Sequence, residues 1–302
     1  MLLRAAHFVM LLGLFTPHPH AAEFTSLCDS QLEKARGCAI RMNGEIVAGD
    51  ASRLTAVLAK KAPHIGVYST LILNSPGGDV EEAFRIADVT RGAVLETSTV
   101  DMSQAAQLVS KRKSPSQYMY RCASSCFLIW AAGARRQHVS SDNAPPIGLG
   151  LHRPYFAKQT YASSDVNNLA RRQQELTSRV KEYLVREAIP QSLIEEMMRR
   201  SSREILWLDS SSAGPDHISE YAPWFEELLI ARCGFDPARM VDEEDRIVRA
   251  IREAAQSGKD HLNRLEESAL YKGFVERKQR IEGCLLHEIR LPAQSKGRGS
   301  GS

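Results

Sequence analysis

The sequence predicts an α/β fold built on a parallel sheet, with a helical extension after it. Apolar strand-like segments alternate with amphipathic helical segments between residues 39 and 151, and this order is typical of parallel strands connected by helices. One strand runs directly into a glycine pair, Gly77 and Gly78, at the strand end where such folds place their sites. From residue 226 onward the chain is highly charged and helical in pattern, which predicts a helical hairpin appended to the core.

The spacing of apolar residues sets the expected elements. Alternation, or a short β-branched apolar run, predicts strands over residues 39–46, 67–73, 94–100, 138–139 and 147–151. Helical spacing predicts helices over residues 51–61, 79–91, 124–132, 167–187 and 192–200. In the first of these helices Leu54, Val57 and Leu58 share one face, which we expect to be buried.

The first 22 residues are typical of a secretory signal peptide, with Arg4 before a short apolar core and Ala21-Ala22 as a cleavage site. The apolar core is too short to span a bilayer, and no later stretch approaches the roughly 18 apolar residues of a spanning helix. We therefore expect a periplasmic or secreted chain without stable membrane insertion. The expected organisation is a signal peptide over 1–22, an α/β domain over 23–220, a helical extension over 221–292 and a disordered tail over 293–302.

The charges are nearly balanced. The 302 residues include 39 Lys and Arg against 36 Asp and Glu, which gives a net charge of +3. No basic patch demands a nucleic-acid partner, so we expect none. The length is sufficient for one substantial domain with a large core.

An even number of cysteines behind a signal peptide predicts disulfides. The six are Cys28, Cys38, Cys122, Cys126, Cys233 and Cys284. Proximity favours a Cys28–Cys38 bridge, and a Cys233–Cys284 bridge would join two C-terminal helices. We expect no metal site, because no pair has the Cys-x-x-Cys spacing and no histidine lies near the cysteines in sequence.

Cys122 and Cys126 are one helical turn apart and flank Ser124. A bridge between them would constrain the turn that presents the Ser124 hydroxyl. The alternative is a pair of buried thiols.

The glycine pair and Ser124 are the candidates for chemistry. The N–H of Gly78 would lie beside a helix N-terminus, where it can stabilise an oxyanion, although Ser-Pro-Gly-Gly can also form a simple tight turn. Ser124 opens an apolar helix, either as a nucleophile or as an N-cap. The dinucleotide-binding pattern Gly-x-Gly-x-x-Gly is absent, and we expect no cofactor.

Taken together, these motifs resemble those of the Clp peptidase family. The matching segments, spread over roughly residues 40–210, are Asn74 to Gly78, Ala123 to Cys126, Ala131 to Ala134 and Gly148 to Pro154. Exported relatives of that peptidase are the most similar, because they also carry cysteines around the serine. The resemblance implies a Clp/crotonase-like spiral of ββα units with the helical extension behind it.

The resemblance also implies a role for each residue of the site. Ser124 would be the nucleophile and His152 its base, while the N–H groups of Gly78 and Ser125 would form the oxyanion hole. Substrates would be peptides or unfolded protein segments. The family assembles into rings, which leaves a homo-oligomer open for this chain.

The sequence departs from the family at the group that orients the histidine. The family has an Asp after the histidine, just before an aromatic-apolar anchor. Here the candidates are Glu204, our first choice, then Ser202 as a neutral substitute and Asp209. Loss of the orienting group costs about 10⁴ in kcat in the serine proteases. A serine–lysine dyad with Lys111 or Lys113 is a minor alternative.

The leading hypothesis is therefore an exported serine peptidase. Its rival is a catalytically inactive Clp-like binding or scaffold protein of the cell envelope, motivated by the missing Asp. A crotonase-like acyl-CoA enzyme is a third reading, which the Ser/His pair and the expected export disfavour.

Overall fold

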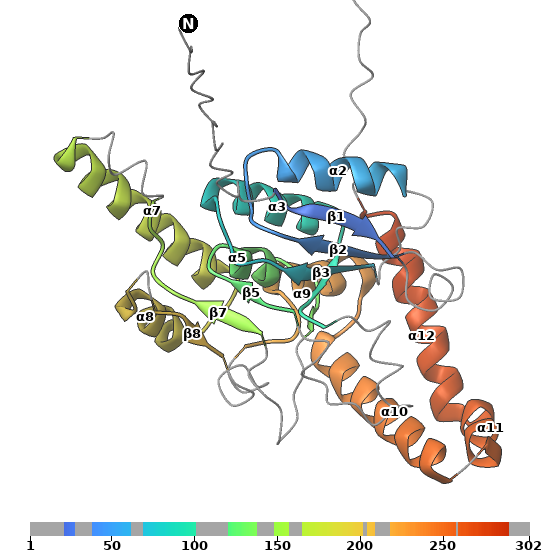
Figure 1. The fold of residues 1–302 in the computed structure, drawn as a ribbon. Coiled ribbons are helices and arrows are strands. Elements are labelled where there is room, and N and C mark those ends of the chain that lie inside the picture. Colours follow the sequence, from blue (N-terminus) through green and yellow to red (C-terminus); the bar gives the residue numbers. More distant parts are fainter. Residues whose placement is uncertain are drawn as a thin grey trace, which may run out of the picture.

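The centre of the chain is a five-stranded sheet with helices packed on it (Figure 1). The computed structural model describes residues 21–27, 38–61, 69–100, 120–137, 148–156, 165–201, 204–208, 218–257 and 259–289. The strands, in spatial order, are β1 (Glu23–Ser26), β2 (Ala39–Asn43), β3 (Thr70–Asn74), β4 (Glu96–Ser98) and β6 (Arg136–Gln137). Neighbours from β2 to β6 are parallel, and β1 is antiparallel to β2.

Three helices connect these strands and cover the sheet, namely α2 (Asp50–Lys60), α3 (Val80–Gly92) and α5 (Cys126–Ala131). The apolar face predicted for the first of them is partly confirmed, because Leu54 and Leu58 are fully buried while Val57 is only half-buried. All six residues of α5 are buried, so this short helix lies inside the core. The mixed α/β class is therefore confirmed.

A second, smaller sheet carries the segments around the candidate nucleophile. It consists of β5 (Cys122–Ala123), β7 (Leu149–Leu151) and β8 (Leu206–Trp207), with β5 parallel to β7 and β8 antiparallel to it. A bridge between Ser75 and Cys122 connects the end of β3 to β5. The glycine pair after β3 and the serine after β5 are thus held on adjoining segments.

The remaining described helices lie toward the C-terminus. Their bounds are α7 (Val166–Arg186), α8 (Gln191–Arg199), α9 (Pro223–Leu228), the π-helical turn η3 (Leu229–Cys233), α10 (Pro237–Ser257), α11 (Lys259–Glu267) and α12 (Ala269–Leu286). In Figure 1, α10, α11 and α12 extend away from the sheet on the side opposite α7. A separate apolar cluster, which includes Phe225, Met240 and Ile281, packs α9, α10 and α12 on Val94 and Ala134.

Two expectations need correction. Both sheets are mixed rather than parallel, because β1 runs antiparallel to its neighbour in the five-stranded sheet and β8 to its neighbour in the smaller one. The helix expected over 124–132 begins only at Cys126, after the short strand β5. A strand of two residues leaves no detectable periodicity in sequence, so no pattern predicted β5. Residues 138–139, expected as a strand, lie outside the described residues, as does most of the proposed signal peptide.

No helix among the described residues is long and apolar enough to cross a membrane.

Candidate active site

Ser124 occupies a sharp turn between β5 and α5. Its φ is +60°, in the left-handed region that non-glycine residues seldom adopt. Its N–H donates to the carbonyl of Gly150 on β7 (2.9 Å), so the turn is anchored to the small sheet. Ser124 is half-buried, whereas Ala123 and Ser125 on either side are buried. A serine presented on a strained strand-to-helix turn is the geometry of a nucleophile elbow.

His152 follows the last residue of β7, the strand beside β5. Because Ala123 is paired with Gly150 in parallel register, the chains leave the small sheet at the same edge. His152 is therefore brought to the side of the Ser124 turn, where it is 8% exposed. Among the described residues no hydrogen bond joins the Ser124 hydroxyl to the imidazole. Such bonds are often long in unliganded enzymes and shorten when substrate binds.

The His152 ring is oriented by a backbone carbonyl. Its Nδ1 lies 2.9 Å from the carbonyl oxygen of Arg153. A carbonyl can only accept, so Nδ1 carries a hydrogen, and in the neutral imidazole the lone pair lies on Nε2. The ring of Tyr155 packs beside the imidazole, with 5.3 Å between ring centroids.

Glu204, the acid expected to orient the histidine, has another partner. Its exposed carboxylate accepts a hydrogen bond from the N–H of Ser201 (3.3 Å). The described residues include no hydrogen bond between Glu204 and His152, so an orienting role for Glu204 stays a prediction. The alternatives Ser202, Asp209, Lys111 and Lys113 lie outside the described residues.

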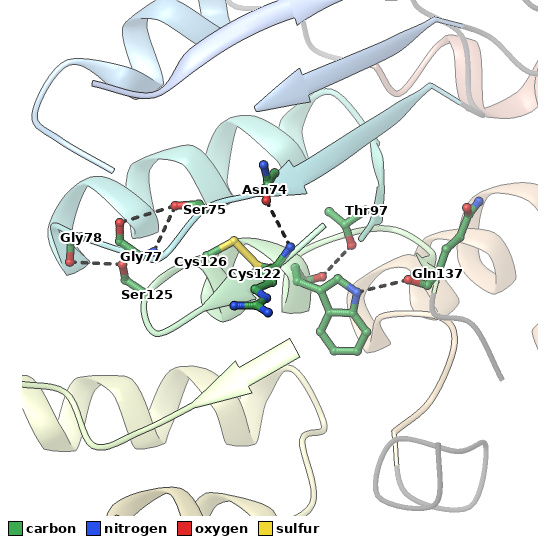
Figure 2. The surroundings of a disulfide bond; sticks show 11 residues. Asn74, Ser75, Gly77, Gly78, Thr97, Cys122, Ser125, Cys126 and Gln137 are labelled. Carbon is green, nitrogen blue, oxygen red and sulfur yellow. Dashed lines mark hydrogen bonds between the residues drawn. A yellow bond between two sulfur atoms is a disulfide. The ribbon is translucent and has the colours of Figure 1, made fainter. Parts of the chain in front are cut away.

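Two N–H groups beside Ser124 are unused. Within the described part of the chain, neither the Gly78 N–H nor the Ser125 N–H donates a hydrogen bond to another group. The two residues are joined by a different contact, because the Ser125 hydroxyl donates to the Gly78 carbonyl (3.2 Å; Figure 2). The predicted oxyanion-hole residues are thus neighbours, each with a donor available.

The glycine pair fits this corner because it lacks side chains. A Cβ on Gly77 would lie 2.6 Å from the Ser124 Cβ, and one on Gly78 would collide with the Ile46 carbonyl. Both glycines also have positive φ, +99° and +145°. Gly77 therefore lets the backbone approach Ser124, and Gly78 lets it approach Ile46, more closely than a residue with a side chain would.

Two residues that sequence reasoning assigned no role hold the glycine loop to the serine strand. The Ser75 hydroxyl accepts from the Gly77 N–H (3.1 Å), while the Ser75 carbonyl accepts from the Ala123 N–H (3.0 Å). The Asn74 side-chain oxygen accepts from the Arg121 N–H (3.2 Å; Figure 2). Both residues belong to the Asn-Ser-Pro-Gly-Gly motif, and this position was the one sequence feature that could have indicated their role.

Of the two alternatives for Cys122 and Cys126, the structure contains the disulfide, with 5.2 Å between the Cα atoms (Figure 2). The alternative of two buried thiols is therefore wrong. The Cys233–Cys284 bridge is confirmed as well. Cys38 is also disulfide-bonded, while Cys28, its expected partner, lies outside the described residues.

A buried ionic network supports α5 from behind. Tyr183 on α7 donates its hydroxyl to the carbonyl of Leu128 in α5 (2.8 Å), and the fully buried Arg136 donates to the carbonyls of Ala131 and Glu187 (2.9 and 2.8 Å). Burial lowers the pKa of Arg136 to about 10 and raises the pKa of Glu187. Arg91 hydrogen-bonds to the Glu187 carboxylate and offsets part of the cost of burying it.

Where the structure describes the chain, no group of three or more His, Cys, Asp or Glu side chains is placed to hold a metal ion. No protein-family model matches the chain, and no curated protein matches it.

Proposed function

We propose that the chain is an exported serine hydrolase, similar to the Clp peptidases, that cleaves peptide bonds in peptides or unfolded protein segments. The observation that carries this proposal is the position of Ser124 at φ +60° on the β5–α5 turn, with Gly77 packed against it. His152 reaches the same edge of the small sheet on the adjacent strand.

The mechanism follows from the donors and acceptors at this edge. The Ser124 Oγ attacks the substrate carbonyl carbon while His152 Nε2 takes the hydroxyl proton. The carbonyl oxygen becomes an oxyanion, and the free N–H groups of Gly78 and Ser125 donate to it. His152 returns the proton to the departing amine. A water, deprotonated by His152, then hydrolyses the acyl-serine and regenerates the hydroxyl.

A carbonyl-oriented histidine is sufficient for the proton transfers. The Arg153 carbonyl fixes the tautomer, which is the first task of the acid in a triad. It stabilises the imidazolium less than a carboxylate does, because it carries only a partial charge. We therefore expect slower turnover than a complete triad gives.

The α/β part, in this proposal, is the Clp/crotonase-like spiral. The parallel succession β2–α2–β3–α3–β4 supports repeated strand-and-helix units. Disulfides at Cys122–Cys126 and Cys233–Cys284 support a periplasmic or secreted location, since such bonds persist in oxidising compartments. Assembly into a homo-oligomer is part of the same family likeness.

A second candidate is an inactive binding or scaffold protein of the cell envelope with the same fold. One observation favours it. Among the described residues no carboxylate is bonded to His152 Nδ1, which is bonded to the carbonyl of Arg153 instead.

Peptide hydrolysis separates the two. The purified chain is incubated with fluorescently labelled unfolded casein and with a library of short fluorogenic peptides, alongside the variants Ser124→Ala and His152→Ala. Exposed Ser178 on α7 provides the matched control, Ser178→Ala. The hydrolase predicts cleavage by the wild type and Ser178→Ala that falls by about 10³-fold or more in the two site variants. Cleavage that persists in Ser124→Ala would support the inactive scaffold protein. So would the absence of cleavage by the wild type and by every variant.

A further inference from the structure

The Cys122–Cys126 disulfide encloses the Ser124 turn. Cys122 is the first residue of β5 and Cys126 the first of α5, so the bond spans the elbow from strand to helix (Figure 2). Between the two cysteines lie both the proposed nucleophile and Ser125, whose N–H is one of the two free donors.

We propose that this disulfide positions the nucleophile elbow, so that the chain becomes an active hydrolase only after Cys122 and Cys126 are oxidised. The inference rests on the proposed function, and it adds a redox condition for activity. Cys122 and Cys126 act through Ser124 and Ser125 and touch no substrate, which makes them positioning residues.

Close packing gives the physical reason. Cys122, Cys126 and the neighbouring Phe127 are fully buried. Two unbonded thiols need more space between their sulfur atoms than a disulfide does, and a closely packed core does not supply it without a shift. Reduction therefore moves the backbone on one side of the turn.

The shift falls on the first residues of α5, because backbone hydrogen bonds hold the strand side and the rest of α5 is anchored by Tyr183 and Arg136. The Cys122 N–H donates to the Gly148 carbonyl (2.7 Å), and the Ala123 N–H donates to the Ser75 carbonyl (3.0 Å). At the start of α5 the only side-chain hydrogen bond among the described residues of the turn is the one from the Ser125 hydroxyl to Gly78 (3.2 Å). A movement at the start of α5 thus displaces the Ser125 N–H from Gly78 and opens the oxyanion hole.

The redox step is an ordinary disulfide exchange. A low-molecular-weight disulfide such as oxidised glutathione accepts two electrons and two protons from the thiols of Cys122 and Cys126, and becomes two glutathione thiols. The chain would therefore be an inactive hydrolase in a reducing compartment and become active in an oxidising one.

The second disulfide is an internal control. Cys233–Cys284 joins η3 to α12 in the helical extension, and both of its cysteines are half-buried. It closes a much longer stretch of chain and so contributes more to global stability, but it does not border Ser124. Removing it tests the effect of losing a disulfide without touching the elbow.

The experiment measures the labelling rate of the serine by a fluorophosphonate probe, together with kcat and KM for a peptide. The first variant, Cys122→Ala/Cys126→Val, keeps roughly the buried volume, and the control is Cys233→Ala/Cys284→Ala. We expect the first variant to lose about 100-fold in labelling rate and kcat, the loss typical of one oxyanion donor, with KM changed by less than about three-fold. The control keeps the wild-type rate. Reduced wild type should recover its rate on addition of oxidised glutathione.

Each outcome is decisive. A wild-type labelling rate in Cys122→Ala/Cys126→Val, or in the reduced chain, overturns the inference. So does a variant that fails to fold by circular dichroism, because the proposed role is local. If oxidised wild type takes no label at all, the proposed function itself fails, which is a different result from equal labelling in all forms.

Discussion

The hydroxyl of Ser125 donates a hydrogen bond to the carbonyl of Gly78 (3.2 Å), across 47 positions of sequence. This bond joins the two backbone segments whose N–H groups remain free beside Ser124. In the proposed mechanism these two donors would be in place before a substrate binds, and preorganised donors are the main source of transition-state stabilisation in acyl transfer.

Adding one methyl group at Gly77 should disable the site. In Gly77→Ala the new Cβ falls 2.6 Å from the Ser124 Cβ, so the serine must move. A displacement of about 1 Å costs on the order of 10²-fold in rate. Fluorophosphonate labelling kinetics measure the loss. Gly273→Ala is the control, because its Cβ meets nothing within 4 Å and it lies within α12. Equal labelling rates for the two variants would contradict the close contact.

Glu204 should be dispensable if the Arg153 carbonyl holds the histidine. We expect Glu204→Gln to change kcat/KM by less than about three-fold, against the roughly 10⁴-fold loss seen when a triad acid is neutralised. His152→Ala provides the large effect for comparison. A loss of 10²-fold or more in Glu204→Gln would show that substrate binding brings Glu204 to the imidazole.

Acid should destabilise the contact between α2 and α3 through Glu82. Burial alone would raise the pKa of Glu82, but hydrogen bonds from the Ala51 N–H and from Arg85 together outweigh it and hold the pKa below its ordinary value of 4.5. A carboxyl whose folded pKa is depressed contributes stability above the unfolded pKa. That stability is lost as the pH falls through the folded pKa.

Urea unfolding from about pH 5 down to about pH 3 measures this loss as a falling free energy of unfolding. In Glu82→Gln the decline should be shallower, since the amide does not titrate in this range. Exposed Glu227→Gln is the control for the loss of one carboxylate. If the free energy of unfolding falls with pH in the same way in Glu82→Gln and in the wild type, Glu82 does not cause the loss of stability in acid.

The Cys233–Cys284 disulfide should carry global stability. It closes a loop with a sequence separation of 51, which corresponds to about 4 kcal/mol of chain entropy in the loop-closure model. The Cys122–Cys126 loop, with a separation of 4, corresponds to about 2 kcal/mol. The free energy of unfolding in urea should therefore drop more in Cys233→Ala/Cys284→Ala than in Cys122→Ala/Cys126→Val. The reverse order would contradict this division of roles.

The sequence predicted the elements that have a readable period. The helix α3 and the strand β3 lie close to their expected ranges, and the glycine pair lies between them as expected. The antiparallel pairing of β1 with β2 was missed, because four alternating residues do not reveal their neighbour. Pairing of β5 with β7 depends on contacts distant in sequence, which no local pattern records.

Motifs named the candidate residues of the site, including the backbone donors Gly78 and Ser125, whose roles stay predictions, but they did not give the contacts that hold these residues. Ser124 and His152 could be named from motifs. The carbonyl that orients His152 belongs to the backbone of Arg153. Because every residue has a backbone carbonyl, the residue type at this position could not predict the contact. The positive φ of Ser124 was equally hidden, since nothing in the sequence marks a serine that adopts it.

Mass spectrometry of the fluorophosphonate adduct tests the central claim most directly. The oxidised chain is treated with the probe, digested and sequenced to find the modified residue. An activated elbow predicts one adduct, on Ser124, which forms in Ser178→Ala and disappears in Ser124→Ala and, to a large degree, in His152→Ala. A probe that modifies Ser125 or another hydroxyl, or that leaves Ser124 unmodified in the folded chain, would contradict the assignment of Ser124 as a nucleophile.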